Sequence, residues 1–227
     1  MLIVSEAWKT SYPGAAQGVL VMHEVANPEH HPALEERKAQ LGARLRAQFA
    51  RSDRAALSAL PSIQPYVNYY NRFKKSYHVL LQLESTALKG KPLPRVAALV
   101  EVMFMAEIQN HLLTAGHDLN ALRAPLRLDV ALTGGGEQYT LLNGKTETLK
   151  LGDMFIADAE GVTSSIIYGP DRRTRITLNT RNVFFTTYAP PGITASAVQQ
   201  HLEDIQANVR LIAPEARTEM LEVYRAE

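Results

Sequence analysis

The 227-residue sequence contains no cysteine. Disulfide bonds, zinc sites built on thiolates and a cysteine nucleophile are therefore excluded, and the composition fits a reducing compartment. A metal ion would need histidine and carboxylate ligands. The 7 histidines have no spacing typical of a metal site, such as His-Glu-x-x-His, so we expect neither a metal nor another cofactor.

Long apolar runs are absent as well. No stretch approaches the roughly 18 apolar residues that a membrane span requires, and the start MLIVSEAWKT lacks the basic region and cleavage site of a signal peptide. We therefore expect a cytoplasmic protein with no membrane partner. The formal net charge is only +1, which excludes a strong nonspecific attraction for phosphate, so any nucleic-acid contact must be local.

Fingerprints of several large enzyme classes are also missing. The sequence has no nucleophile elbow and no Walker or Rossmann motif. The run GGGE at 134–137 lacks the strand-to-helix setting that a phosphate-binding loop requires. Function must therefore be sought in less general motifs.

The first half of the chain has mainly helical periodicity, after one short strand. The strand is predicted at Gly18–Val25, where branched apolar residues lie between turn signals. Helices are predicted after Pro32, around the tyrosine cluster at 66–73, over Tyr77–Lys89, and from Arg95 to about Thr114.

The second half reads as short strands separated by Gly, Asn and Asp turns, from LRLDVALT to NVFFTTY, before ASAVQQHLEDIQANVRLI returns to helical periodicity. No linker or repeat divides the chain. We predict a single α+β domain over 1–227, in which a helical first half packs on a mostly antiparallel β second half. Its parts are an N-terminal strand and long helix in 1–65, a central region at 66–190 and C-terminal helices in 191–227.

Several motifs follow one another in a fixed order between Tyr66 and Tyr188. They are LESTALKGKPLPRVAALVE, TAGHDLNAL, GGGEQYTLLNGKTETLKLGDMFIADAEG and YGPDRRTRITLNTRNVFF. In order and spacing they resemble the B3/B4 editing module of the bacterial phenylalanyl-tRNA synthetase beta subunit and its stand-alone homologues. The third motif is the most specific. The leading segment WKTSYPGAAQGVLVMHEVANP is similar to the N-terminal part of the stand-alone members.

This resemblance implies a B3/B4 fold and a pocket that hydrolyses the ester of a misacylated tRNA, with tRNA or aminoacyl-tRNA as the partner. The synthetase pocket uses Asn, His, Gly and Glu where this sequence aligns Phe104, Ala115, Gly169 and Thr186. Only the glycine is kept. Phe cannot hold water by a hydrogen bond and Ala cannot transfer a proton, so the tyrosine-editing chemistry does not carry over unchanged. A Phe in place of Asn predicts a smaller and more apolar pocket than one that admits tyrosine. We therefore expect the substrate to carry a smaller amino acid.

Three residues near the altered positions are candidates for catalysis. His117 and Asp118 place an imidazole and a carboxylate at what we predict to be one helix end, where a neutral imidazole accepts a proton from water. The alternative is a core histidine and an aspartate that caps the next turn. Glu137 follows three glycines, and Gly135 and Gly136 would let backbone amides approach a substrate closely. The alternative there is a hairpin connection.

The loop YGPDRRTRIT supplies the candidate RNA contact. Arg172, Arg173 and Arg175 are suited to phosphate through bidentate hydrogen bonds. A solvated basic loop would have the same composition.

Two functions of different class remain open on these residues. The first is a trans-acting aminoacyl-tRNA deacylase, because an aminoacyl ester is already activated and needs little more than a positioned water. The second is a non-catalytic module of the same fold that binds tRNA or an amino acid, which the loss of three polar pocket groups favours.

Overall fold

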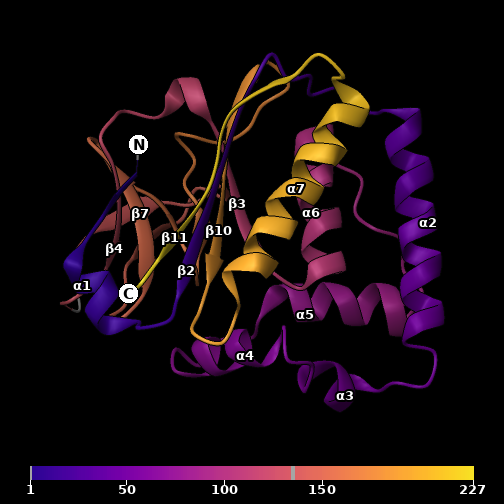
Figure 1. Cartoon of the computed structure of the whole chain (residues 1–227), viewed down its shortest axis with the longest axis horizontal. Coiled ribbons are helices and arrows are strands. Elements are labelled where there is room, and N and C mark those ends of the chain that lie inside the picture. The colour runs from indigo at the N-terminus through magenta and orange to yellow at the C-terminus, as the bar shows by residue number, and fades with distance from the viewer. Residues whose placement is uncertain (1, 134–135) are drawn as a thin grey trace.

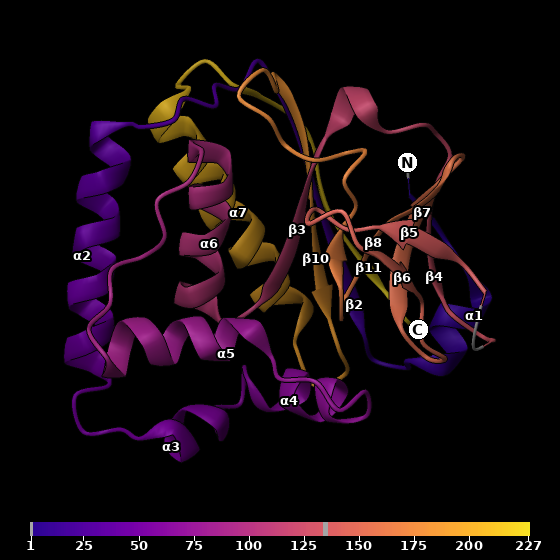
Figure 2. The same ribbon diagram turned by 180° about the vertical axis from the view of Figure 1, so that it is seen from behind.

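The computed structural model of the chain describes residues 2–133 and 136–227. In this part of the chain two β-sheets lie side by side, and helices cover the outer face of one of them (Figures 1 and 2). The covering helices are α7 (Ala195–Ile212), α6 (Ala98–Asn110) and α2 (Pro32–Gln48), with α2 farthest from the sheet. The α+β architecture predicted from the sequence is confirmed.

The helix-covered sheet takes its strands from both halves of the chain. In spatial order they are β11 (Arg217–Arg225), β2 (Ala16–His23), β10 (Asn182–Ala189) and β3 (Leu113–Asp118), each antiparallel to its neighbour. We call it the four-stranded sheet. Because β2 pairs with both β10 and β11, the first half of the chain cannot form this sheet alone.

The second sheet has five strands in the described residues, in the order β1 (Leu2–Val4), β4 (Leu126–Val130), β7 (Met154–Asp158), β8 (Gly161–Ser165) and β9 (Gly169–Pro170). Only the β1–β4 pair among them is parallel. Beside it lies a small hairpin of β5 (Gln138–Thr140) and β6 (Thr146–Thr148).

Shorter helices close the lower end of the molecule in Figure 1. They are α3 (Arg54–Ser58), α4 (Gln64–Asn71) and α5 (His78–Leu83), which continues into a π-helical turn, η1 (Glu84–Leu88). Helix α1 (Glu6–Ser11) lies beside β4, and a 3₁₀ turn, η2 (Leu119–Ala121), follows β3. Among the described residues, no helix is both long and apolar enough to cross a membrane.

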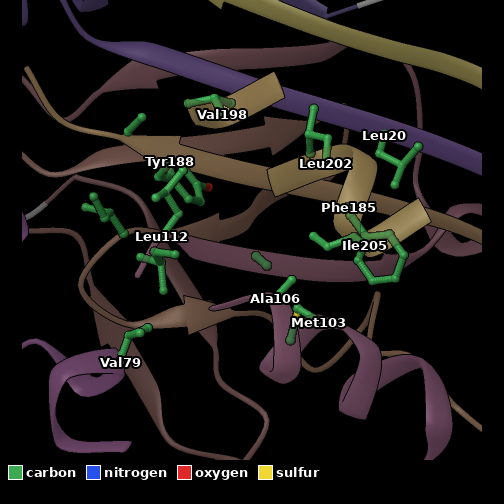
Figure 3. Packing of buried hydrophobic residues seen from close by; sticks show 14 of the residues in the cluster. Leu20, Val79, Met103, Ala106, Leu112, Phe185, Tyr188, Val198, Leu202 and Ile205 are labelled. Atoms are coloured by element: carbon green, nitrogen blue, oxygen red, sulfur yellow. The ribbon is translucent and has the colours of Figure 1, made fainter. Parts of the chain in front are cut away.

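Helix α7 forms because its apolar residues recur at helical spacing after a capping threonine. The Thr194 hydroxyl accepts a hydrogen bond from the Ala197 amide at 3.1 Å. Val198 and Leu202 then face the sheet, and Figure 3 shows Leu202 close to Leu20 of β2. Gly18 permits this close approach, because a Cβ there would lie 2.6 Å from Val198 Cγ1.

Strand β2 is buried along almost its whole length. Helix α7 covers one of its faces and the five-stranded sheet lies on the other side, so the usual apolar-polar alternation disappears. One large core cluster extends over both halves of the chain and includes Leu20, Leu99 and Phe185.

Two predicted elements are wrong. The helix expected to reach Thr114 ends at Asn110, because His111 adopts a left-handed conformation with φ of 63°. The next residues form β3. Its strand signal is weak in the sequence, because Gly116 and several neighbouring residues are poor strand formers. Pairing with β10 overrides that local preference.

The second error concerns the C-terminal helices expected in 191–227. Only α7 is a helix there, and residues 217–225 form β11, which pairs with β2 along one side. Its four charged residues Arg217, Glu219, Glu222 and Arg225 obscured the strand signal. An edge strand tolerates such charges because they discourage pairing with another chain.

We expect the chain to unfold in a single transition, because the four-stranded sheet and the core cluster draw on both halves. Limited proteolysis with thermal melting of the products checks this expectation. A stable fragment beginning near Arg123 that keeps its own cooperative melt would show that two domains have been merged.

Candidate functional site

A cavity of about 580 Å³ lies between α5 and α6 on one side and β3 with the β8–β9 hairpin on the other. Most of its wall is apolar. The apolar side chains are Val100, Met103, Phe104, Leu113, Leu142, Ile167 and Ile176. This volume falls in the range of small-molecule sites, in which apolar walls carry a few polar groups that fix orientation.

The turn between α6 and β3 places a carboxylate in this cavity. Because the chain reverses at His111, the side chain of Glu107 returns to the start of β3, and its Oε1 accepts a hydrogen bond from the Thr114 amide at 2.8 Å. Glu107 is only 1% exposed. Burial raises its pKa to about 8, although the Thr114 amide acts in the opposite direction.

His78, the first residue of α5, lines the same cavity. The Tyr70 hydroxyl donates its proton to the Ile166 carbonyl at 2.5 Å, so at 3.4 Å from that hydroxyl the Nδ1 of His78 acts as the donor. The Nε2 then carries the lone pair. Burial lowers the pKa of His78 to about 4, which keeps the ring neutral at pH 7.

Three of the pocket residues predicted from the sequence line this cavity, namely Phe104, Ala115 and Gly169. Gly169 has a φ of 81°, which favours glycine. Thr186 pairs with Ala115 in the sheet but does not line the cavity. It is fully buried, and its hydroxyl accepts from Gln17 Nε2 and donates to the Gly18 carbonyl.

The structure places His117 outside the cavity lining, on β3 between the two sheets. Thr174 Oγ1 donates to Asp171 Oδ1, so it accepts from His117 Nδ1 at 2.7 Å, and His117 Nε2 lies 3.3 Å from Ser164 Oγ. Burial lowers the pKa of this histidine to about 3. This is the geometry of a neutral core histidine, and it gives no support to the predicted catalytic role.

Asp118 and Glu137 likewise lie away from the cavity. Asp118 Oδ1 accepts from the Asn120 amide at 3.0 Å and Oδ2 from Thr180 Oγ1 at 2.7 Å, so the carboxylate organises the turn after β3. Glu137 is exposed before β5, next to the exposed Gly136. Gly135, predicted as a pocket residue, lies outside the described residues.

The three arginines of the predicted RNA-binding loop differ in their surroundings. Arg173 donates to both carboxylate oxygens of Asp158, at 2.8 and 2.9 Å, which makes it a structural partner rather than a free cation. Arg175 is exposed and lines the cavity, and Arg172 is exposed nearby on the same loop. Lys75 Nζ lies 4.4 Å from the ring centre of Tyr168, another lining residue.

Arg175 thus lines the cavity, Lys75 lies against its lining residue Tyr168, and Arg172 precedes Arg175 on the same loop. We call these three cations the cationic rim. Within residues 2–133 and 136–227, no group of three or more histidine or carboxylate side chains is placed to hold a metal ion. The polar groups of the cavity are instead suited to bind and orient an organic ligand and water.

Residues 65–212 match the family described as B3/4 domain. The chain belongs to this family. The matched region contains every residue that lines the cavity, from His78 to Tyr188. The family resemblance identified from the sequence is thus confirmed.

A solved structure of an N-terminal fragment of the phenylalanyl-tRNA synthetase beta subunit from Pyrococcus horikoshii is similar to this chain, at 12% identity and a TM-score of 0.49. The match covers 98% of this chain and 53% of that fragment, so the chain spans about half its length. No curated protein matches the sequence.

Proposed function

We propose that this B3/4 domain is a trans-acting deacylase, which hydrolyses the ester between an amino acid and the 3′ end of a tRNA within the cavity. The observation that carries the proposal is the neutral His78 in an apolar cavity that Arg175 also lines, with Lys75 against the lining residue Tyr168. Such a cavity accepts the amino acid, and the rim suits the phosphates that follow it.

Hydrolysis of an aminoacyl ester needs few catalytic groups. An aminoacyl ester is activated, so the main requirement is a water molecule held next to the carbonyl carbon and a group that accepts its proton. The lone pair on His78 Nε2 is suited to this role, because the ring is neutral at pH 7 and its Nδ1 is already engaged with Tyr70. His117, Asp118 and Glu137 are not needed in this scheme.

Phe104 favours a small, apolar amino acid. Its ring lines the cavity from α6 beside Met103 and Val100. An aromatic ring occupies volume and offers no hydrogen bond, so a phenol group would find no partner on this wall.

The cationic rim should provide local contacts to the tRNA backbone. Changing Lys75, Arg172 and Arg175 together to glutamine should weaken tRNA binding by about tenfold and reduce the salt slope of the affinity by about one per lost phosphate contact. Filter binding over a series of salt concentrations measures both. The matched control is Arg37, Arg44 and Arg51, three arginines on the far α2 side, changed in the same way. Equal losses in the two triple variants would remove the rim from the interface.

The direct test of the function is a deacylation screen over a panel of misacylated tRNAs. We expect hydrolysis of at least one tRNA that carries a small apolar amino acid, and none of tyrosyl-tRNA. If no ester is hydrolysed under conditions in which a synthetase editing domain is active, the catalytic proposal fails.

The second candidate function is a non-catalytic module that binds tRNA or an amino acid. The observation in its favour is the loss of polar groups, because Phe104 and Ala115 present no proton-transfer group to the cavity and Thr186 does not reach it. Saturable tRNA binding without hydrolysis in the same screen would support this function instead.

A further inference from the structure

One buried carboxylate oxygen at the cavity has no partner. Oε1 of Glu107 is held by the Thr114 amide, but Oε2 has no hydrogen-bond partner among the described residues. The side chain lines the cavity and is 1% exposed. Buried polar atoms are nearly always paired in native proteins, so an unpaired one facing a cavity indicates a group that arrives from outside.

A second unpaired acceptor lines the same cavity from the neighbouring helix. Oε1 of Gln82, on α5, is buried and has no partner among the described residues. A single ligand with several donors would satisfy both acceptors. A primary ammonium group has three N–H donors, and its charge complements an ionised carboxylate.

No cationic side chain offsets the charge of Glu107 in the described part of the chain. Desolvation dominates its environment, and the one opposing influence is the amide of Thr114. An external cation, rather than an internal one, would therefore stabilise the ionised form of Glu107. The titratable groups around it are Tyr66 and Tyr70 of α4, Tyr77 and His78 at the start of α5, His201 of α7, and Arg175 and Tyr188 across the cavity.

We propose that Glu107 and Gln82 bind the α-ammonium group of the aminoacyl substrate, while its side chain lies against the apolar wall at Phe104. The inference rests on the proposed function only in taking the aminoacyl end of a tRNA as the occupant of the cavity. It makes Glu107 a residue that selects an aminoacyl group over an acyl group without the amine.

Binding should release a proton. In the free protein at pH 7 the Glu107 carboxyl is mostly protonated, because burial raises its pKa to about 8. An ammonium ligand favours the ionised form, so the carboxylic proton passes to the buffer as the ion pair forms. We expect release of about one proton per ligand at pH 7.

The experiment compares two non-hydrolysable probes, 3′-deoxy-3′-(L-alanylamino)adenosine and its propionyl counterpart, which differ only in the α-ammonium group. Isothermal titration calorimetry in two buffers of different ionisation enthalpy measures affinity and proton release together. The alanyl probe should bind at least about tenfold more tightly than the propionyl probe, since hydrogen bonds to charged groups are the stronger ones. Only the alanyl probe should release a proton.

Two variants assign the effect to its residues. Glu107→Gln keeps an acceptor for the Thr114 amide but removes the charge, so it should abolish the preference for the alanyl probe and the proton release. Gln82→Leu should lower the affinity for the alanyl probe and leave the affinity for the propionyl probe unchanged. Glu203→Gln, on the exposed side of α7, is the matched control and should change nothing.

Equal affinities of the two probes for the wild-type protein, no binding of the alanyl probe, or alanyl binding without proton release would each overturn the inference. The free oxygen of Glu107 would then hold a buried water only. Hydrolysis plays no part in these measurements. A protein that binds the alanyl probe through Glu107 but hydrolyses no aminoacyl-tRNA would contradict the proposed deacylase and leave the ammonium site standing.

Discussion

Replacing His78 with glutamine should lower the rate of aminoacyl-tRNA deacylation by about 100-fold, the usual loss when a positioned general base is removed. Glutamine retains hydrogen-bonding capacity and similar length, but its amide accepts no proton at neutral pH. The expected loss corresponds to about 2.7 kcal/mol of transition-state stabilisation. Single-turnover hydrolysis of the best substrate from the screen measures the rate without a contribution from product release.

The matched control is His30→Gln. His30 lies before α2, and its side chain is 48% exposed, so the same substitution there should leave the rate unchanged. Binding of a non-hydrolysable analogue to His78→Gln should also stay within a few-fold of wild type, because the proton-accepting role belongs to the reaction and not to binding. A full hydrolysis rate in His78→Gln would move the chemistry to the terminal hydroxyl of the tRNA.

Strong periodicity made parts of the fold predictable from the sequence. Leu34, Leu41 and Leu45 identified α2, and the apolar repeat after Thr194 identified α7. A helix with one buried face needs apolar residues at helical spacing, and this spacing is visible in the sequence. Strand β3 gave no such signal. Its Gly116 is there for packing, because a Cβ would lie 2.8 Å from Ile176 Cδ1.

The error at β3 also explains the interpretation of His117. With the helix assumed to continue to Thr114, the histidine was expected at a helix end beside the pocket. On a strand, residues 115 and 117 share one face, and the sheet carries His117 past the cavity into the space between the sheets. The wrong secondary structure predicted for this segment thus explains why His117 was expected in the pocket and is found in the core.

The cavity itself was partly predictable. Phe104, Ala115 and Gly169 were found because family motifs placed them, whereas periodicity alone would have assigned Phe104 to the core. The position of Glu107 was informative in the sequence. A glutamate within the apolar run VEVMFMAEIQN is expected to be buried and to need a partner. Gln82 had no signal in the sequence, because its unpaired oxygen becomes evident only when α5 and α6 are placed together.

Replacing His117 with alanine should lower the free energy of unfolding by about 3 kcal/mol at pH 7. The substitution removes the hydrogen bonds to Thr174 and Ser164 and leaves a buried cavity between the sheets. Deacylation by the fraction that remains folded should be unchanged, because His117 does not line the cavity. Urea unfolding followed by circular dichroism, with activity measured at low temperature, separates the two effects.

The pH dependence of stability provides an independent check on the same residue. The pKa of His117 is lowered from an unfolded value of about 6.5 to about 3, so between these values the unfolded chain binds the proton that the folded chain excludes. The contribution of His117 to the free energy of unfolding must then fall as the pH drops through this window. Glu107 and Asp153, whose pKa values are raised to about 8 and about 7, contribute in the opposite direction. The buried His111 and His201 and the partly buried His78, whose pKa values are also lowered, contribute in the same direction as His117. Between pH 7 and pH 5, His117→Ala should therefore lose less free energy of unfolding than the wild-type protein does. An identical pH profile in His117→Ala would mean that the folded protein protonates this ring as readily as the unfolded chain does, and the lowered pKa ascribed to burial between Thr174 and Ser164 would be wrong.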